Sequence, residues 1–384
     1  MKIIRPVPIT DANLTSSNQA ALDSGISAYN SGTTYAQGDL AIVNSPSATV
    51  TISQAAPAVI TWNAHYMTEK TPVVFTTDGV LPTGITAGRA YFIHSIIDAN
   101  RFRISASIGG APIVTTSAGS GTHTCTASTH FLYESLQAGN TGNVPRVPES
   151  VWWVKVSSTN RWAMFDTTLN SVTTGSSVEV VIDFDSLVDS VVLLNLSASS
   201  VTVVIEDDSE GEVYNETHDL TATSGIITIW DYLFEPVYRD GALYLSGLPP
   251  VINGTITITV TEISSDALVQ VGTCVIGSEV EVGGTQYGAG VGLQDYSTID
   301  ENDYGFYGIQ ERSFSDTGSL QVYVENSKVD MVVRLLKSLR ATACVYIGSD
   351  DFKCTFYYGF PSDWNMTIPY TTHSILNIEI KGLT

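Results

Sequence analysis

The sequence predicts a mainly β protein of several domains, and three observations support this. Only 15% of the 384 residues are charged, whereas about 25% is usual for soluble domains. Ser, Thr, Gly and Val take the place of the missing charges, and these residues favour strands and turns. Short apolar runs also alternate with Gly, Asn and Asp turn signals along the chain. A chain of this length has room for roughly two to four domains.

Residues 1–27 are predicted to form an extended N-terminal arm. They contain Pro6, Pro8 and several Asp, Asn and Ser residues, and they show little periodicity. Such an arm could wrap around a neighbouring subunit, and a frayed terminus is the alternative. The first residues carry no apolar stretch with a small-residue cleavage site, so no signal peptide is expected.

Residues 28–44 and 128–158 carry two halves of one pattern. The first half has Tyr29 and the run Tyr35-Ala36-Gln37-Gly38-Asp39. The second half has Tyr133, the loop Asn140-Thr141-Gly142-Asn143-Val144-Pro145, and the pair Trp152-Trp153. Joined, residues 28–43 and 129–156 resemble a small carbohydrate-binding module of the chitin-binding type. The resemblance implies a split module with a second domain inserted in it.

The resemblance also implies a sugar-binding face. Sugar rings stack their C–H faces on aromatic side chains, and amides or carboxylates bind their hydroxyls. The candidate carbohydrate-binding residues are Tyr29, Tyr35, Asp39, Tyr133, Asn140, Trp152 and Trp153. The alternative is that the aromatic residues form the core of a domain that has little else to bury. Asp39, which follows Gly38, also fits a turn.

Residues 45–127 are predicted to be an inserted β-domain. Strand-like runs fall at 73–76, 90–97, 101–105 and 113–116, with turn signals between them. The sequence of residues 75–92, together with that of residues 117–123, resembles a small β-domain that recurs in phage tail fibres. This resemblance implies that the chain is part of a viral appendage.

Residues 159–268 are predicted to form a β-sandwich that is jelly-roll-like. The pattern resembles that of galactose-binding jelly rolls, with apolar runs separated by polar turns. Residues 255–261 alternate strictly between apolar and polar, which indicates a strand with one buried face and one solvent-exposed face. The other strand-like runs are 178–184, 190–196, 201–206, 226–230 and 242–245.

Residues 269–384 are predicted to form an α+β domain, an antiparallel sheet with one helix. Apolar residues with helical spacing place the helix at about 328–340, with Asn326-Ser327 as the N-cap. Strand-like runs flank it at 319–324, 344–347, 355–358 and 374–380. By analogy with tail-tube and tail-tip proteins, this part is a candidate docking domain.

Charge and motifs argue against several functional classes. The net charge of −22 argues against binding nucleic acid or anionic lipid. No run approaches the ~20 apolar residues of a membrane span. Catalytic and nucleotide-binding fingerprints are missing from the sequence, so neither an enzyme nor a cofactor is expected.

Metal sites are not expected either. The four cysteines, Cys125, Cys274, Cys344 and Cys354, form no C-x-x-C pair, so free thiols are favoured over a zinc site or a Cys344–Cys354 bridge. The acidic stretch with Asp295, Asp300, Glu301 and Asp303 could offer oxygens to calcium, but its spacing fits a solvated loop better.

Taken with the two resemblances, the sequence indicates a structural subunit of a bacteriophage virion, made in the host cytoplasm and built into the tail. The sequences of residues 159–166 and 283–288 also resemble segments of phage proteins. The expected partners are other tail proteins and further copies of the chain, with three- or six-fold symmetry. The alternatives are a receptor-binding protein for host surface glycan and, less favoured, a glycan-degrading enzyme.

Overall fold

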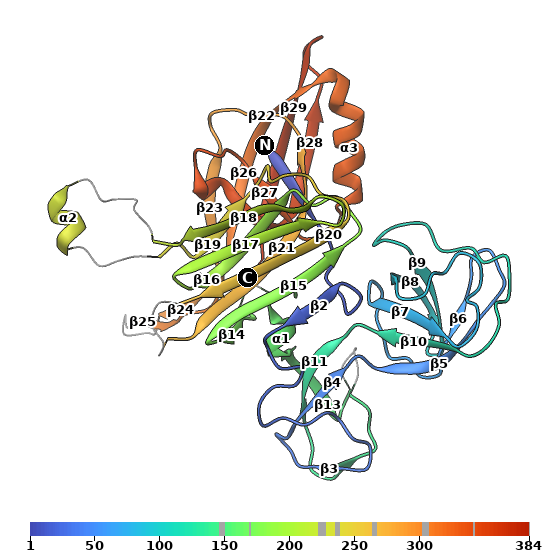
Figure 1. The fold of residues 1–384 in the computed structure, drawn as a ribbon. Helices are drawn as coiled ribbons and strands as arrows, with labels where there is room; N and C mark the ends of the chain where they lie inside the picture. Colours follow the sequence, from blue (N-terminus) through green and yellow to red (C-terminus); the bar gives the residue numbers. More distant parts are fainter. Residues whose placement is uncertain are drawn as a thin grey trace.

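The computed structural model confirms a mainly β protein with several sheets and one long helix near the C-terminus (Figure 1). It describes residues 1–145, 150–168, 170–221, 228–234, 239–262, 267–301, 307–340 and 342–383. A β-sandwich and a large sheet form the body. A small barrel and a smaller aromatic module extend from the body beside each other.

The sandwich consists of two sheets that enclose one apolar core. Along β20 every second residue is buried, as the alternation in its sequence predicts. The first sheet runs in the order β18 (Gly211–Asp219), β17 (Ser200–Asp207), β20 (Gly254–Thr261), β15 (Ser177–Phe184) and β2 (Leu14–Ser17). The second sheet includes β19 (Ala242–Leu245), β16 (Ser190–Ser197), β21 (Val269–Glu281) and β14 (Thr173–Gly175). Leu14 of β2 lies in the shared core, together with residues of β15, β16, β17, β20 and β21.

The second sheet of the sandwich continues into the C-terminal region without a break. After β21 come β1 (Lys2–Pro6), β27 (Cys344–Ile347), β28 (Phe356–Thr367), β29 (His373–Gly382), β26 (Phe314–Glu325) and β22 (Gly284–Thr285). Helix α3 (Val329–Ser338) covers one face of this part with Val332, Leu335 and Leu336. The expected boundary at 268/269 therefore falls at the start of a strand that serves both regions.

The N-terminus differs from the expected arm over residues 1–27. Strand β1 pairs with β21 on one side and with β27 on the other. Ile3 and Ile4 point to opposite faces of the sheet, and both are fully buried. β2 in turn pairs with β15 of the sandwich. A strand buried on both faces shows no alternation, and its partners lie hundreds of residues away, so the local sequence carried no sign of it.

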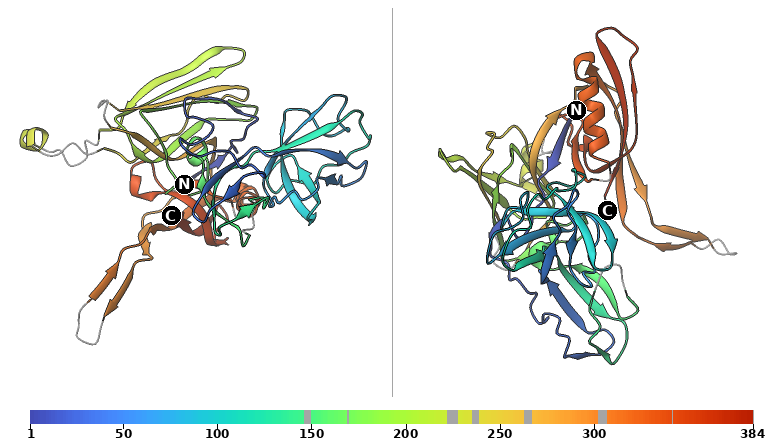
Figure 2. Two further views of the ribbon diagram at one scale, coloured as in Figure 1. Left: turned by 90° about the horizontal axis from the view of Figure 1, so that it is seen from below. Right: turned by 90° about the vertical axis from the view of Figure 1, so that its right-hand side faces the viewer.

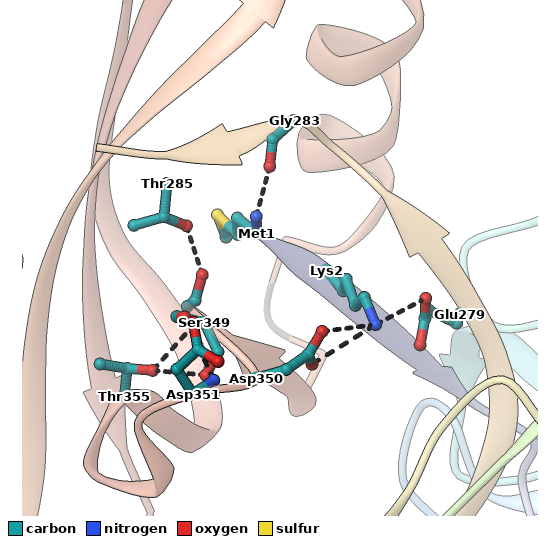
Figure 3. A network of polar contacts seen from close by, with 10 residues as sticks. Met1, Lys2, Glu279, Gly283, Thr285, Ser349, Asp350, Asp351 and Thr355 are labelled. Carbon is teal, nitrogen blue, oxygen red and sulfur yellow. Dashed lines mark hydrogen bonds and ion pairs between the residues drawn. The ribbon is translucent and has the colours of Figure 1, made fainter. Parts of the chain in front are cut away.

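Polar contacts hold the start of β1 in place (Figure 3). The Lys2 ammonium lies 3.0 Å from Asp350 and 3.5 Å from Glu279, which joins the chain start to β21 and to the loop after β27. The Met1 amine donates to the Gly283 carbonyl. Burial is the main cause that lowers the pKa of this amine.

The large sheet curls so that its first strand approaches β28. Tyr244 of β19 packs edge-on against Phe356 of β28, with ring centroids 4.5 Å apart. Asp240, just before β19, forms a 2.9 Å ion pair with Lys353. The concave side is filled by an apolar cluster that contains Ile4, Val192 and Tyr358. The sandwich and the C-terminal region therefore share a second core on this side of the sheet.

The aromatic module and the barrel occupy residues between β2 and β14. In the module, β4 (Leu40–Asn44), β11 (His130–Ser135) and β13 (Trp153–Ser158) form a sheet, and β3 (Thr34–Tyr35) pairs with β12 (Asn140–Thr141). The closed barrel contains β5 (Ser47–Ile52), β6 (Ile60–Thr61), β7 (Pro72–Thr77), β8 (Ala90–Asp98), β9 (Arg101–Ser105) and β10 (His123–Ala127). The strand expected at 113–116 is absent. There the Thr115 hydroxyl donates to the Ser53 carbonyl, and contact with β9 is limited to an isolated bridge at Pro112 and the hydrogen bond from the Ile113 N–H to the Ile104 carbonyl.

The helices partly match the sequence predictions. The helix expected at 328–340 is confirmed as α3, preceded by the 3-10 turn η1 (Asn326–Lys328). The predicted cap is wrong, because Asn326 donates to the Tyr370 carbonyl and accepts from Ser374 instead. Helix α2 (Ile229–Phe234) replaces part of the strand expected at 226–230, of which residues 226 and 227 lie outside the described residues. The short helix α1 (Asn160–Ala163) follows β13, and the turn η2 (Lys353–Thr355) precedes β28.

The contact between β1 and β21 can be tested at Gly277. A Cβ there would lie 1.9 Å from the backbone oxygen of Arg5, so the two strands would have to separate. We expect Gly277→Ala to lower the free energy of unfolding by about 2–3 kcal/mol, as overpacking does. Gly284→Ala is the matched control, because a Cβ at Gly284 meets nothing within 4 Å. Denaturant unfolding of both variants measures the difference. Equal stability of the two would contradict the close approach of β1.

Candidate functional site in the aromatic module

The aromatic rings of the split module pack against one another. Tyr35 from β3, Tyr133 from β11 and Trp153 from β13 form one buried cluster. The Tyr35 and Trp153 rings meet edge to face with centroids 4.9 Å apart. Tyr29 stacks on Tyr35 at 5.9 Å and completes the cluster from its rim. Because these rings fill the space between the two small sheets, they act as the core of the module.

The polar side chains of the module fix its main loop. Asn140 is fully buried and donates to the Ser135 hydroxyl at 3.0 Å and to the Trp152 carbonyl at 3.3 Å. Its own carbonyl accepts a hydrogen bond from the Asn143 amide at 2.9 Å. The indole N–H of Trp153 donates to the Asn143 backbone oxygen at 2.7 Å. Asn140 and the Trp153 indole are thus satisfied from within the module, whereas the buried Tyr29 hydroxyl has no hydrogen-bond partner among the described residues.

Asp39 belongs to a turn. Its carboxylate accepts a 2.7 Å hydrogen bond from the Ala36 N–H, and its own N–H donates to the Ala36 carbonyl. Gly38 before it has a φ of +87°, which few residues other than glycine adopt readily. The run Gly38-Asp39 therefore shapes the entry into β4, and the carboxylate remains exposed at the surface.

These contacts divide the seven candidate carbohydrate-binding residues into two groups. Tyr35, Tyr133, Asn140 and Trp153 are between 0 and 8% exposed, so they have no free face for a sugar. Tyr29, Asp39 and Trp152 remain at the surface, where Tyr29 and Trp152 are half-buried. The residues of the buried group therefore belong to the core of the module, and the candidate sugar-binding face is reduced to Tyr29, Asp39 and Trp152.

A polar junction that the sequence did not reveal joins the module, the barrel and the body. His130, the first residue of β11 after the barrel, is 5% exposed and stacks flat on Trp162 at 4.0 Å. Its Nε2 lies 3.1 Å from the carboxylate of Asp11, and its Nδ1 contacts the side-chain oxygen of Asn44. The imidazole thus contacts the N-terminal segment, the end of β4 and helix α1. The only signal in the sequence is a histidine placed where the module resumes.

Asp11 anchors the junction from the N-terminal side. Its carboxylate accepts a 2.8 Å hydrogen bond from Ser45, and its N–H donates to the Ser128 hydroxyl at 2.8 Å. Ser45 and Ser128 flank the barrel, so both of its connections are attached to the same residue. Burial alone would raise the pKa of Asp11, but the contacts with His130, Ser45 and Ser128 outweigh burial and lower it.

Among the residues that the structure describes, the other candidate groups are not assembled into a site. Within the described ranges, no three His, Cys, Asp or Glu residues come together as metal ligands. Asp295 and Asp300 lie on separate strands, while the side chain of Glu301 and residue Asp303 lie outside what the structure describes. All four cysteines are free, and burial raises the pKa of Cys274 and Cys344 to about 12.

Comparison with known proteins adds no assignment. No known family profile matches the chain, and no curated protein shows significant similarity to it. Among the helices of the described residues, none has the length and apolar character needed to cross a membrane. Function must therefore be inferred from the residues and contacts of the chain itself.

The Asp11–His130 junction predicts a loss of stability in acid. Because the pKa of Asp11 is lowered in the folded protein, its ionised form stabilises the fold above the unfolded value, near 3.9. That contribution is lost as the pH falls through the folded pKa. We expect Asp11→Asn to be less stable than the parent at pH 7 and the difference to shrink below about pH 4. Denaturant unfolding from pH 7 to pH 3 measures this, with the exposed Asp208→Asn as control. A difference that does not change with pH would contradict this role of the carboxylate.

Proposed function

We propose that the chain is a structural subunit of a bacteriophage tail, in the baseplate, the tail tip or a fibre attachment. It would be made in the host cytoplasm and assemble into the virion as a homo-oligomer with three- or six-fold symmetry, next to other tail proteins. The resemblance of residues 75–92 and 117–123 to tail-fibre domains supports this, as does the split module around them.

One structural observation supports the proposal most strongly. A closed barrel with its own core is held away from the body by the polar junction at Asp11 and His130. The core of the barrel includes Trp62, Phe75 and Phe102 and is separate from the other apolar clusters. Both connections of the barrel meet Asp11 at the junction. A rigid domain displayed in a fixed direction suits a particle that presents parts outward, and the geometry needs no catalytic group.

Labelling on particles tests the tail assignment. Gold-conjugated antibodies raised against the barrel, residues 47–127, should decorate the tail in electron micrographs of the phage that carries this gene. The copy number in each virion, measured by quantitative mass spectrometry, should be a multiple of three or six. Antibodies against the major capsid protein give the control pattern on the head. Gold on the head in place of the tail would overturn the proposal.

Recognition of host surface glycan is a second candidate function, favoured by one observation. Trp152 and Tyr29 remain partly exposed at the rim of the module although the other aromatic residues are buried. If a sugar stacks there, Trp152→Ala should lose about 1–3 kcal/mol of binding, the value of a well-packed aromatic contact. Glycan-array binding of the full chain measures this. Tyr287→Ala is the control, because Tyr287 is fully exposed in another part of the chain. Equal binding by both variants would exclude this face.

A further inference from the structure

A long two-stranded ribbon projects from the C-terminal sheet (Figure 2). It contains β23 (Gly290–Asp295), β24 (Thr298–Glu301), β25 (Tyr307–Gln310) and the start of β26, and we call residues 290–301 and 307–316 the ribbon. Residues 290–292 still belong to the large sheet, because their partners in β26 also pair with β29, and the two-stranded part begins after them. β23 pairs with β26, and β24 pairs with β25. A two-stranded hairpin is at best marginally stable in water by itself. An extended ribbon of this kind is therefore expected to gain a partner surface.

The ribbon exposes large apolar side chains in patches. Opposed residues of an antiparallel pair share a face, so Val291, Leu293 and Phe314 lie on one side near the body. Ile299, Tyr307 and Ile309 share a face farther out. All six are between 54 and 73% exposed. Contiguous exposed apolar groups on a strand ribbon mark a site of association.

The ribbon is also acidic. The sequence from residue 290 to residue 316 contains six acids and one base, Arg312. Asp295, Asp300 and Glu311 are exposed among the described residues. A partner for this surface should therefore offer positive charge beside apolar groups. Few parts of a chain with a net charge of −22 meet that requirement.

Helix α3 carries the matching charge. Four of the 17 Lys and Arg residues lie between 328 and 340, where the only acid is Asp330. We call Arg334, Lys337 and Arg340 the basic face, because the 3.6-residue period places them on one side of the helix. Arg334, Lys337 and Arg340 are exposed, and Met331 lies beside them with 39% exposure. Within the part of the chain that the structure describes, none of the four bases takes part in an ion pair.

The two surfaces point away from each other on one chain. In Figure 1 the ribbon leaves on the left of the body and α3 lies on the right of the C-terminal sheet, and Figure 2 shows the same separation. The ribbon therefore cannot reach the basic face of its own chain. Two copies repel each other across most of their acidic surfaces, so the basic face is where a second copy can approach. The ribbon has about the 20–30 residues that one side of a standard interface uses.

We propose that the ribbon of one copy docks on the basic face of the next copy. Apolar side chains of the ribbon pack beside Met331 and the stems of Arg334 and Lys337, while the acids of the ribbon pair with the bases. Because the two surfaces differ, the contact is heterologous, and the three- or six-fold symmetry of the proposed assembly closes it into a ring. This inference deepens the proposed function and rests on its homo-oligomeric assembly.

Charge exchange tests the contact on the full chain. Light scattering and sedimentation should show multiples of 41.2 kDa, with dissociation in high salt. Asp295→Lys with Glu311→Lys, or Arg334→Glu with Lys337→Glu, should each weaken association at least about tenfold, and Asp295 is chosen because it shares a face with Phe314. Combining all four changes should restore association to within about threefold, because the charges are then exchanged. Asp208→Lys with Glu210→Lys, in the exposed turn after β17, is the control and should leave the mass unchanged.

Two outcomes would overturn the proposal. One is a parent chain that stays monomeric up to about 100 µM, because its association would then be weaker than a Kd of that order. The other is a four-fold variant that associates no better than the two-fold variants. Circular dichroism of each variant checks that it is folded, and recovery in the four-fold variant confirms this independently. Gold on the phage head would overturn the tail assignment and leave this contact standing, whereas insensitivity to charge exchange would do the reverse.

Discussion

The insertion of β1 between β21 and β27 is the constraint on which the body depends. One strand of five residues completes the hydrogen bonds of two others and contributes to a core on each face. Burial of side chains such as Ile3 and Ile4 is worth about 1.5–3 kcal/mol each. Without β1, the large sheet would split into a sandwich half and a C-terminal half. The two regions are therefore one folded unit, and the barrel and the aromatic module stand apart from it.

The molecule uses its aromatic residues differently in different places. In the module they are the core, because a domain of this size has few other residues to bury. In the ribbon and in helix α2 they face solvent, as Phe314 and Trp230 do. Aromatic content alone therefore does not identify a binding face. Exposure is the better guide, and it shifts attention from the carbohydrate-binding pattern of the module to the projecting ribbon and helix α2.

Patterns local to a segment predicted much of the fold. Alternation identified β20, and apolar spacing identified α3. Long-range pairing was not predictable, because the sequence of residues 2–6 does not indicate that they pair with residues 277–281. The strand expected near Ile229 is a helix over the described residues 229–234, and this helix lies apart from the sheets of the body. At the candidate site the sequence identified the residue types, but which aromatic rings are buried depends on how the module packs. The polar junction at His130 was not predictable either, because it depends on contacts with Asp11 and Trp162.

The way the barrel is attached has a thermodynamic consequence. Asn44 and His130, which precede and follow it, face each other as paired residues of adjacent strands. Closing a loop of more than eighty unstructured residues would cost entropy that grows with the logarithm of loop length. A folded insert whose own ends lie together behaves like a short loop, so the module closes its sheet at little cost. The same geometry would admit another domain with adjacent ends, which makes this position suited to exchange of whole domains by recombination.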